Sequence, residues 1–189
     1  MKTDGTARQP AKSDGAAPSG ADQDARARRY AAALLGQRAY SRKKLIDRMT
    51  RKGFDDAVAQ RVAERFVSAG VLDDAALAAV MVRAEIARKP AGPFLLEMKL
   101  VAKGIDRATA RDAANEALAD RDLAADALAL ATKRLAAISP SLEDATRRRR
   151  VYASLARRGF SPDICRVAVE RAMGPMGKTT GEMWAETEV

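Results

Sequence analysis

Four consecutive arginines, Arg147–Arg150, form the densest cluster of charge in the chain, and guanidinium groups bind carboxylates and phosphates. Four successive positions cover every side of a helix, so all four cannot face one partner, and a solvated helix start explains them as well as a binding site does. Capping does not explain them, because cations near a helix N-terminus oppose the helix dipole by a few tenths of a kcal/mol. A phosphate backbone or an acidic groove as the partner would explain the four arginines, and binding to it would weaken steeply as the salt concentration rises.

A second basic cluster lies about one hundred residues earlier and comprises Arg42, Lys43, Lys44, Arg48, Arg51 and Lys52. Lys44, Arg48 and Lys52 recur every four residues, so they share one face of a helix. Leu45 and Met49 lie on the opposite face. A solvated outer face and a binding face account for this cluster equally well.

One stretch resembles an ATP-binding loop. Ala172–Thr179 reads AMGPMGKT, which satisfies the relaxed pattern of a small residue, four spacers and Gly-Lys-Thr. A phosphate loop leaves a buried strand and opens a helix, whereas here a helix precedes the stretch and ten residues follow it. We therefore expect no ATP binding.

The sequence lacks the residues that other common catalytic and metal sites need. The chain has no histidine and one cysteine, which excludes the common zinc sites, His-activated nucleophiles and an internal disulfide. Cys165 follows an apolar residue in a predicted helix and is expected to be a packing thiol. Asp73 and Asp74 are expected to cap a helix rather than act as an acid–base pair. The sequence predicts a protein that is not an enzyme and has no metal or cofactor.

The elements that position the basic residues follow a threefold repeat. A basic residue, a glycine and a large apolar residue end the segments MTRKGF, LVAKGI and LARRGF, at Met49–Phe54, Leu100–Ile105 and Leu155–Phe160. Apolar residues also stand four and eight positions before each glycine, which is the stripe of a helix that stops there. Each glycine suits a left-handed C-terminal cap, and the apolar residue after it would fold back onto the helix.

Further helices are predicted on both sides of this segment. Start signals follow the glycines at Asp55 or Asp56, at Asp106, and at Ser161 with Pro162. The third helix then has inward positions five, nine and thirteen residues past the glycine: Val58, Val62 and Phe66; Thr109, Ala113 and Ala117; Ile164, Ala168 and Ala172. The first helix of each unit is predicted at 25–35, 74–88 and 122–138. The unit is therefore three helices, repeated at steps of 51 and 55 residues.

The sequence thus predicts an all-α protein, an elongated tandem array of three three-helix repeats with disordered tails. The predicted boundaries are 1–24 for the first tail, 25–72, 73–120 and 121–174 for the repeats, and 175–189 for the second tail. Small helical units stacked in file would span on the order of 60 to 70 Å. Five aromatic residues are in register with the apolar stripes and are expected in the cores: Tyr30, Tyr40, Phe54, Phe66 and Tyr152.

Charge and hydropathy bound the location and the partners. The chain carries +9 overall and the tails −1 and −2, which leaves +12 for the repeats. Such a field favours polyanions or acidic protein surfaces. The chain has no apolar run long enough to span a membrane and no signal-peptide pattern, so we expect a cytoplasmic monomer with no membrane contact.

Several segments together resemble the RecX family of bacterial recombination regulators, over about residues 26–174. The resemblance includes Ser-Arg-x-x-Leu at Ser41–Leu45, Leu-Asp-Asp at Leu72–Asp74, the second segment that begins at Gly92, and Arg-Arg-Gly-Phe at Arg157–Phe160. Leu77 stands where the family more often has Phe, and either residue fills a core.

The resemblance implies a regulator, most often an inhibitor, that lodges in the groove of a RecA filament on DNA and hinders filament growth, ATP hydrolysis and strand exchange. DNA would be bound weakly or through RecA. The candidate contacts to RecA or DNA are Arg42, Lys44, Arg48, Lys52, Lys99, Lys103, Arg147, Arg148, Arg149, Arg150, Arg157 and Arg158. The alternative is a helix-turn-helix-like DNA-binding protein or transcription factor that acts without RecA, since helix pairs joined by a glycine turn also fit that motif.

Overall fold

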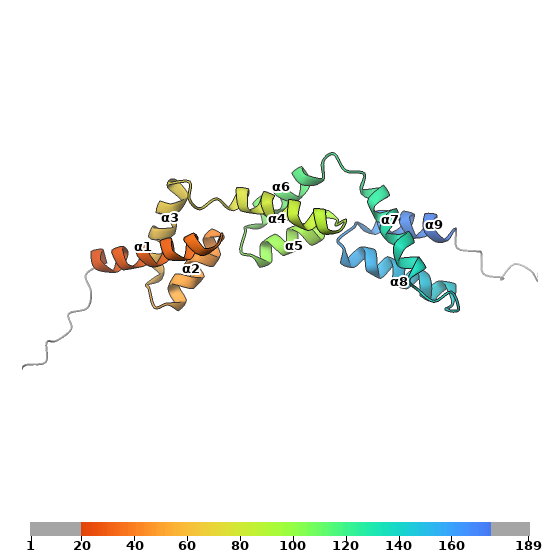
Figure 1. The fold of residues 1–189 in the computed structure, drawn as a ribbon, viewed down its shortest axis with the longest axis horizontal. Helices are drawn as coiled ribbons and strands as arrows, with labels where there is room; N and C mark the ends of the chain where they lie inside the picture. The colour runs from red at the N-terminus through yellow and green to blue at the C-terminus, as the bar shows by residue number, and fades with distance from the viewer. Residues whose placement is uncertain (1–19, 175–189) are drawn as a thin grey trace, which may run out of the picture.

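The computed structural model describes residues 20–174, which form helices and no strand (Figure 1). The helices of this part are α1 (Gly20–Gln37), α2 (Arg42–Arg51), α3 (Asp56–Ser68), α4 (Asp74–Arg88), α5 (Pro93–Ala102), α6 (Arg107–Leu118), α7 (Leu123–Ala136), α8 (Asp144–Arg157) and α9 (Pro162–Met173). The predicted all-α class is confirmed. None of these helices is long and apolar enough to cross a bilayer.

The helices pack in three consecutive triplets, each around its own apolar core. Figure 1 shows the triplets in file along one long axis, with the described ends of the chain at opposite ends of the row. The apolar positions predicted before the glycines are at most 1% exposed and centre the three cores: Leu45 and Met49, Leu96 and Leu100, Val151 and Leu155. The predicted elongated array of three-helix units is confirmed.

Each middle helix ends in a Schellman motif at the repeated glycine. In the first unit the N–H of Gly53 donates to Thr50 O (2.9 Å) and the N–H of Phe54 donates to Met49 O (3.2 Å). The same two bonds recur around Gly104 and Gly159, and all three glycines have positive φ, between +80° and +97°. The following apolar residue packs back into its own core, as predicted.

The start signals also act as predicted. Asp73, Asp106 and Ser161 are N-caps whose side chains accept bonds from backbone N–H groups three residues later. Asp55 is the N-cap of α3, without a side-chain bond. All five predicted core aromatics pack against a core, and the rings of Tyr30 and Phe54 lie 5.8 Å apart.

Two boundaries or registers differ from the sequence prediction. α1 begins at Gly20, so the predicted tail 1–24 is too long: Asp24 lies on this helix and accepts a bond from Arg61 of α3. That bond is the main reason that the pKa of Asp24 is lowered. The third helix of each unit buries a wider face than the predicted stripe, because it packs against both other helices of its unit. Buried residues outside the stripe are Ala59, Ala63, Ala110, Ala114, Leu118, Cys165 and Val169, while five predicted inward residues are only half-buried: Phe66, Thr109, Ala117, Ile164 and Ala172.

The ends of the chain fall outside this description. Residues 1–19 and 175–189, which include most of the first predicted tail and all of the second, lie outside the described residues. So do residues 175–179 of the phosphate-loop-like stretch, of which Ala172 and Met173 end α9.

Candidate functional site

The middle helices of the three units, α2, α5 and α8, follow one another along the same long side of the row, the lower side in Figure 1. They differ sharply in charge. α2 and α8 each carry five basic residues and one acidic residue, whereas α5 has only Lys99 and Glu97. The side formed by these helices is therefore cationic at both ends and neutral in the middle.

The neutral helix α5 has an exposed apolar stripe. Phe94, Met98 and Val101 are 62%, 52% and 39% exposed. Their spacing of four and three residues places them on one helix face. Large apolar side chains that share an exposed face are typical of a protein interaction surface.

A cationic hollow of about 570 Å³ lies between the first and second units. Its walls include Arg38, Lys44 and Arg48, and its lining also contains Leu77 and Met81 of α4. Arg38 stacks over the ring of Tyr40, 4.6 Å from the ring centroid. The hollow contains one acid, Asp47, which pairs with Lys44 at 3.8 Å. It is thus a mixed surface that suits a protein segment with both apolar and acidic side chains.

A second hollow, of about 400 Å³, lies in the third unit between α7 and α8. It is lined by four arginines, Arg134, Arg149, Arg150 and Arg157, and by Ala153. All four arginines are exposed, and among the described residues none of them makes an ion pair or a hydrogen bond through its side chain.

The joint between the first two units fixes α2 against the end of α5. Ser41, the N-cap of α2, donates its hydroxyl to the carbonyl of Lys103 at 2.7 Å. The N–H of Arg42 donates to the carboxylate of Asp74 at 2.8 Å. A Cβ on Gly104 would lie 2.8 Å from the Ser41 hydroxyl, so the glycine permits this contact. Burial raises the pKa of Asp74, which is the cost of placing a carboxylate in the joint.

The joint between the second and third units has the same arrangement as the first joint, but here backbone contacts backbone. The N–H of Gly92, the N-cap of α5, donates to the carbonyl of Arg158 at 2.8 Å. A Cβ on Gly92 would lie 2.1 Å from the carbonyl oxygen of Gly159, and one on Gly159 would lie 2.2 Å from the backbone nitrogen of Leu95. The two backbones therefore meet where neither has a side chain. A Cβ on Gly53, in the first unit, would meet nothing within 4 Å among the described residues.

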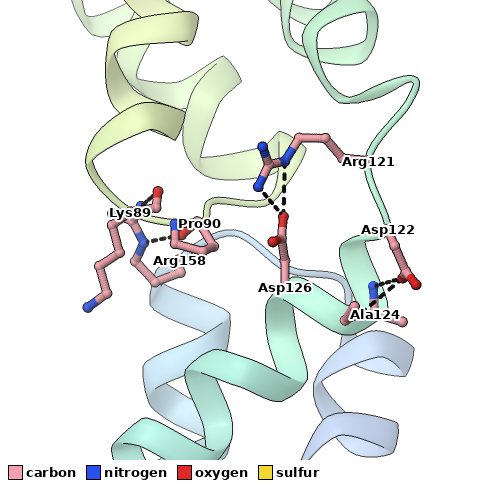
Figure 2. Close-up of polar contacts among 8 residues, drawn as sticks. Lys89, Pro90, Arg121, Asp122, Ala124, Asp126 and Arg158 are labelled. Atoms are coloured by element: carbon pink, nitrogen blue, oxygen red, sulfur yellow. Dashed lines mark hydrogen bonds and ion pairs between the residues drawn. The ribbon is translucent and has the colours of Figure 1, made fainter.

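The side chain of Arg158 clamps this second joint (Figure 2). Its guanidinium donates to the carbonyls of Lys89 (2.7 Å) and Pro90 (2.8 Å) and to the carboxylate of Glu85 (3.0 Å). Glu85 also pairs with Lys99, and hydrogen bonds from Lys99 and Arg158 lower its pKa. The two carbonyls lie directly after α4, where backbone carbonyls have no partner within the helix, so Arg158 satisfies them.

A second arginine fixes the start of the third unit. Figure 2 shows Arg121, in the connection after α6, with its guanidinium on the carboxylate of Asp126 in α7, at 2.7 and 3.0 Å. Asp122 caps the same helix by accepting from the N–H groups of Ala124 and Ala125. Leu123 packs against both neighbouring cores, so this connection is held on its polar and its apolar side.

The twelve basic residues predicted as contacts fall into two groups. Seven are engaged within the chain: Arg42 with Glu64, Lys44 with Asp47, Arg48 with Tyr40, Lys99 with Glu85, Arg147 with Asp144, Arg148 with the Gly174 carbonyl, and Arg158 with the joint. The other five make no such side-chain contact with the described residues: Lys52, Lys103, Arg149, Arg150 and Arg157.

Sequence reasoning missed three parts of this surface. Arg38, which directly follows α1, and Arg134 of α7 reach the two hollows from outside the basic clusters, so only packing brings them there. The stripe of Phe94, Met98 and Val101 lies on a short helix that is apolar on most sides, which hides the exposed face in the pattern. The four-residue and three-residue spacing of these side chains was the one available signal.

Comparison with known proteins assigns the same three units. Family models described as the first, second and third three-helix domains of RecX match residues 27–66, 73–113 and 120–169. A Regulatory protein RecX of Chlorobium phaeobacteroides (strain BS1) is 32% identical over 138 residues, which cover 73% of this chain and 87% of that protein. One of Mycobacterium leprae (strain Br4923) is 35% identical over 156 residues, covering 80% and 89%.

Solved structures share the fold. The crystal structure of RecX from Lactobacillus salivarius superimposes with a TM-score of 0.68 at 21% identity, covering 80% of this chain and 97% of that one. A second crystal structure of a regulatory protein RecX has a TM-score of 0.66 at 24% identity, covering 76% of this chain and 70% of that one.

We predict that Gly92→Ala destabilises the chain although its φ of −83° suits any residue. The new methyl group would press on the backbone of Gly159, at a cost of about 1–3 kcal/mol. The control is Gly36→Ala, in α1 with nothing within 4 Å, which should stabilise by about 0.5–1 kcal/mol. Urea denaturation measures both. Equal stability of Gly92→Ala and the unchanged chain would contradict the tight joint.

We also predict a pH-dependent effect of Glu85→Gln. Because Lys99 and Arg158 lower the pKa of Glu85 in the folded state, its ionised form adds stability above about pH 4.3, the unfolded value. That stability disappears as the pH falls through the lower, folded pKa. The variant should be about 1 kcal/mol less stable at pH 7, and its stability should approach that of the unchanged chain as the pH falls through the folded pKa. The control in the same denaturation series is Glu116→Gln, which makes the same chemical change at an exposed position of α6.

Proposed function

Since this chain belongs to the RecX family, we propose that it regulates the RecA recombinase by binding in the groove of the RecA–DNA filament. In this proposal it acts as an inhibitor in the cytoplasm, as a monomer and without catalysis, and it limits filament extension, ATP hydrolysis and strand exchange. The observation that carries the proposal is the row of α2, α5 and α8 along one side of an elongated molecule.

A row of separate binding surfaces suits a partner that is itself a repeating polymer. Once one unit is bound, the others are held near the neighbouring subunits at high effective concentration, so three weak contacts act as one strong contact. The tight glycine joints support this, because they keep the three surfaces in fixed order and direction. A chain bound across several subunits would oppose the changes in subunit arrangement that accompany hydrolysis and strand exchange.

The exposed stripe on α5 is the proposed contact with RecA itself. Phe94 and Met98 are large, apolar and more than half exposed, and buried aromatic and Met side chains supply much of the energy of protein interfaces. The cationic helices on either side would steer the stripe to an acidic protein surface and raise the association rate.

The proposal predicts that the purified chain lowers the DNA-dependent ATP hydrolysis of RecA. Hydrolysis is measured with RecA preassembled on single-stranded DNA while the concentration of this chain is increased. The rate should fall to a small fraction of its starting value at saturation. Unchanged turnover at saturating protein would contradict the proposal, and tight binding to duplex DNA without any effect on RecA would favour the helix-turn-helix alternative.

The stripe can be tested separately. Phe94→Ala/Met98→Ala should raise the concentration needed for half-maximal inhibition of RecA at least about tenfold, because two anchoring side chains are lost. Its unfolding free energy should change little, since both side chains are exposed. The matched control is Val80→Ala/Val167→Ala, which removes two exposed apolar side chains from α4 and α9. Equal inhibition by both variants would exclude the stripe as the contact.

A further inference from the structure

No acidic side chain lines the arginine hollow of the third unit, whereas the hollow lined by Arg42 and Lys43 and the one lined by Arg148 and Arg166 both contain acidic side chains. Elsewhere Arg61 and Arg65 pair with Asp24, Arg107 and Arg111 pair with Glu97, and Arg166 pairs with Asp163. Even the hollow between the first two units contains Asp47. Four guanidiniums with no counter-charge repel one another, so an anion at this place would relieve that repulsion.

The run Arg147–Arg150 divides into two functional pairs. Arg147 pairs with Asp144 within the first turn of α8, and Arg148 donates to the carbonyl of Gly174 after α9, so both side chains are engaged inside the third unit. Arg149 and Arg150 are the exposed pair and line the hollow. The fold therefore presents half of the run to one side and uses the other half internally.

The chemistry of the hollow selects phosphate over a protein surface. All its charges are guanidiniums, whose planar pairs of N–H donors match phosphate oxygens. Its lining contains only Ala153 besides the arginines, so it lacks the apolar anchors that give protein interfaces their energy. The hollow between the first two units has such residues in Leu77 and Met81, which makes it the better protein site.

The spacing along α8 suits an extended phosphate backbone rather than a single ion. Arg149 and Arg150 lie seven to eight residues before Arg157, which is about 10–12 Å along the helix axis. In a duplex, successive phosphates of one strand are about 3.4 Å apart along the axis, so the row covers about three phosphate-to-phosphate steps. Arg134 of α7 adds a fourth guanidinium from the second wall.

We propose that this hollow, formed by Arg134, Arg149, Arg150 and Arg157, binds the phosphate backbone of DNA directly and without RecA. The proposal rests on the proposed function for its setting, since the filament supplies the DNA strand. It assigns different tasks to the units: the third unit binds DNA, while α5 contacts protein.

The test is the binding of fluorescein-labelled single-stranded oligothymidine to the full chain without RecA, measured by fluorescence anisotropy over a range of NaCl concentrations. The variant Arg149→Ala/Arg150→Ala/Arg157→Ala should lower the slope of log affinity against log salt by about 2, since each single-strand phosphate contact contributes about 0.7. The affinity at low salt should fall at least tenfold.

The matched control removes the same charge elsewhere. Arg107→Ala/Arg111→Ala/Arg166→Ala takes three exposed, ion-paired arginines from α6 and α9 and should keep the slope of the unchanged chain. Equal losses in the two variants would mean that net charge alone binds DNA, and this would overturn the proposal. So would an unchanged slope in the hollow variant. Circular dichroism melting identifies a variant that has not folded. If the triple variant does not fold, the single change Arg150→Ala replaces it, and the slope should then decrease by about 0.7.

A parallel ATPase assay separates this inference from the proposed function. If the unchanged chain inhibits RecA but the hollow variant binds DNA as well as the unchanged chain does, the DNA site is wrong and the proposed regulation stands. If the hollow binds DNA in a salt-dependent way but the chain does not inhibit RecA, the DNA site stands and the proposed regulation is wrong. If the hollow variant lost binding to RecA in the absence of DNA but kept its DNA binding, the site would be a protein contact and the proposal would be wrong.

Discussion

The arrangement of this protein depends on the contact between the backbone at one repeated glycine and the start of the preceding middle helix. At the second joint the Gly92 N–H donates to Arg158, and a Cβ on either Gly92 or Gly159 would overlap the opposing backbone. At the first joint the Ser41 hydroxyl donates to the carbonyl of Lys103, and a Cβ on the adjacent Gly104 would overlap that hydroxyl. Each glycine thus ends its own helix in a left-handed cap and admits the neighbouring unit. Because both joints use the same ends of the middle helices, α2, α5 and α8 come to lie along one side.

The basic residues divide according to what the joints and helix ends require. Arg158 saturates carbonyls at the end of α4, and Arg121 holds α7 through Asp126 (Figure 2). These guanidiniums are structural, since removing them would leave buried or half-buried polar groups without partners. The same residue type at Arg149 and Arg150 has no such task within the described part of the chain. Net charge alone therefore overstates the binding surface, and the pairing of each side chain separates the two roles.

The sequence predicted what is local and missed what depends on contacts between distant helices. A helix that ends at Gly53, Gly104 or Gly159 is encoded within about ten residues, by an apolar stripe, a glycine and an apolar residue that folds back. The start of α1 was missed because it depends on a distant contact: Asp24 accepts a bond from Arg61, which lies 37 residues away along the chain. Packing between helices brings Arg134 to the arginine hollow and engages Arg158 in the second joint, and neither position can be read from the local sequence. The candidate contacts could therefore be chosen by charge from the sequence, but their division into engaged and free groups required the structure.

The distribution of apolar and charged surface along the row has a consequence for how the parts act together. Contacts made by α2 and α8 would weaken with salt, because exposed charges are screened over about 10 Å at 0.1 M salt, whereas burial of the α5 stripe is largely independent of salt. As salt rises, the ends would release first and the chain would remain attached through its middle. The gain from multivalency would then be lost together with the ionic contacts, since it exists only while several units are bound at once. The affinity of the whole chain would therefore fall more steeply with salt than the affinity of any single unit, and the cause would be the order of the units as much as their charge.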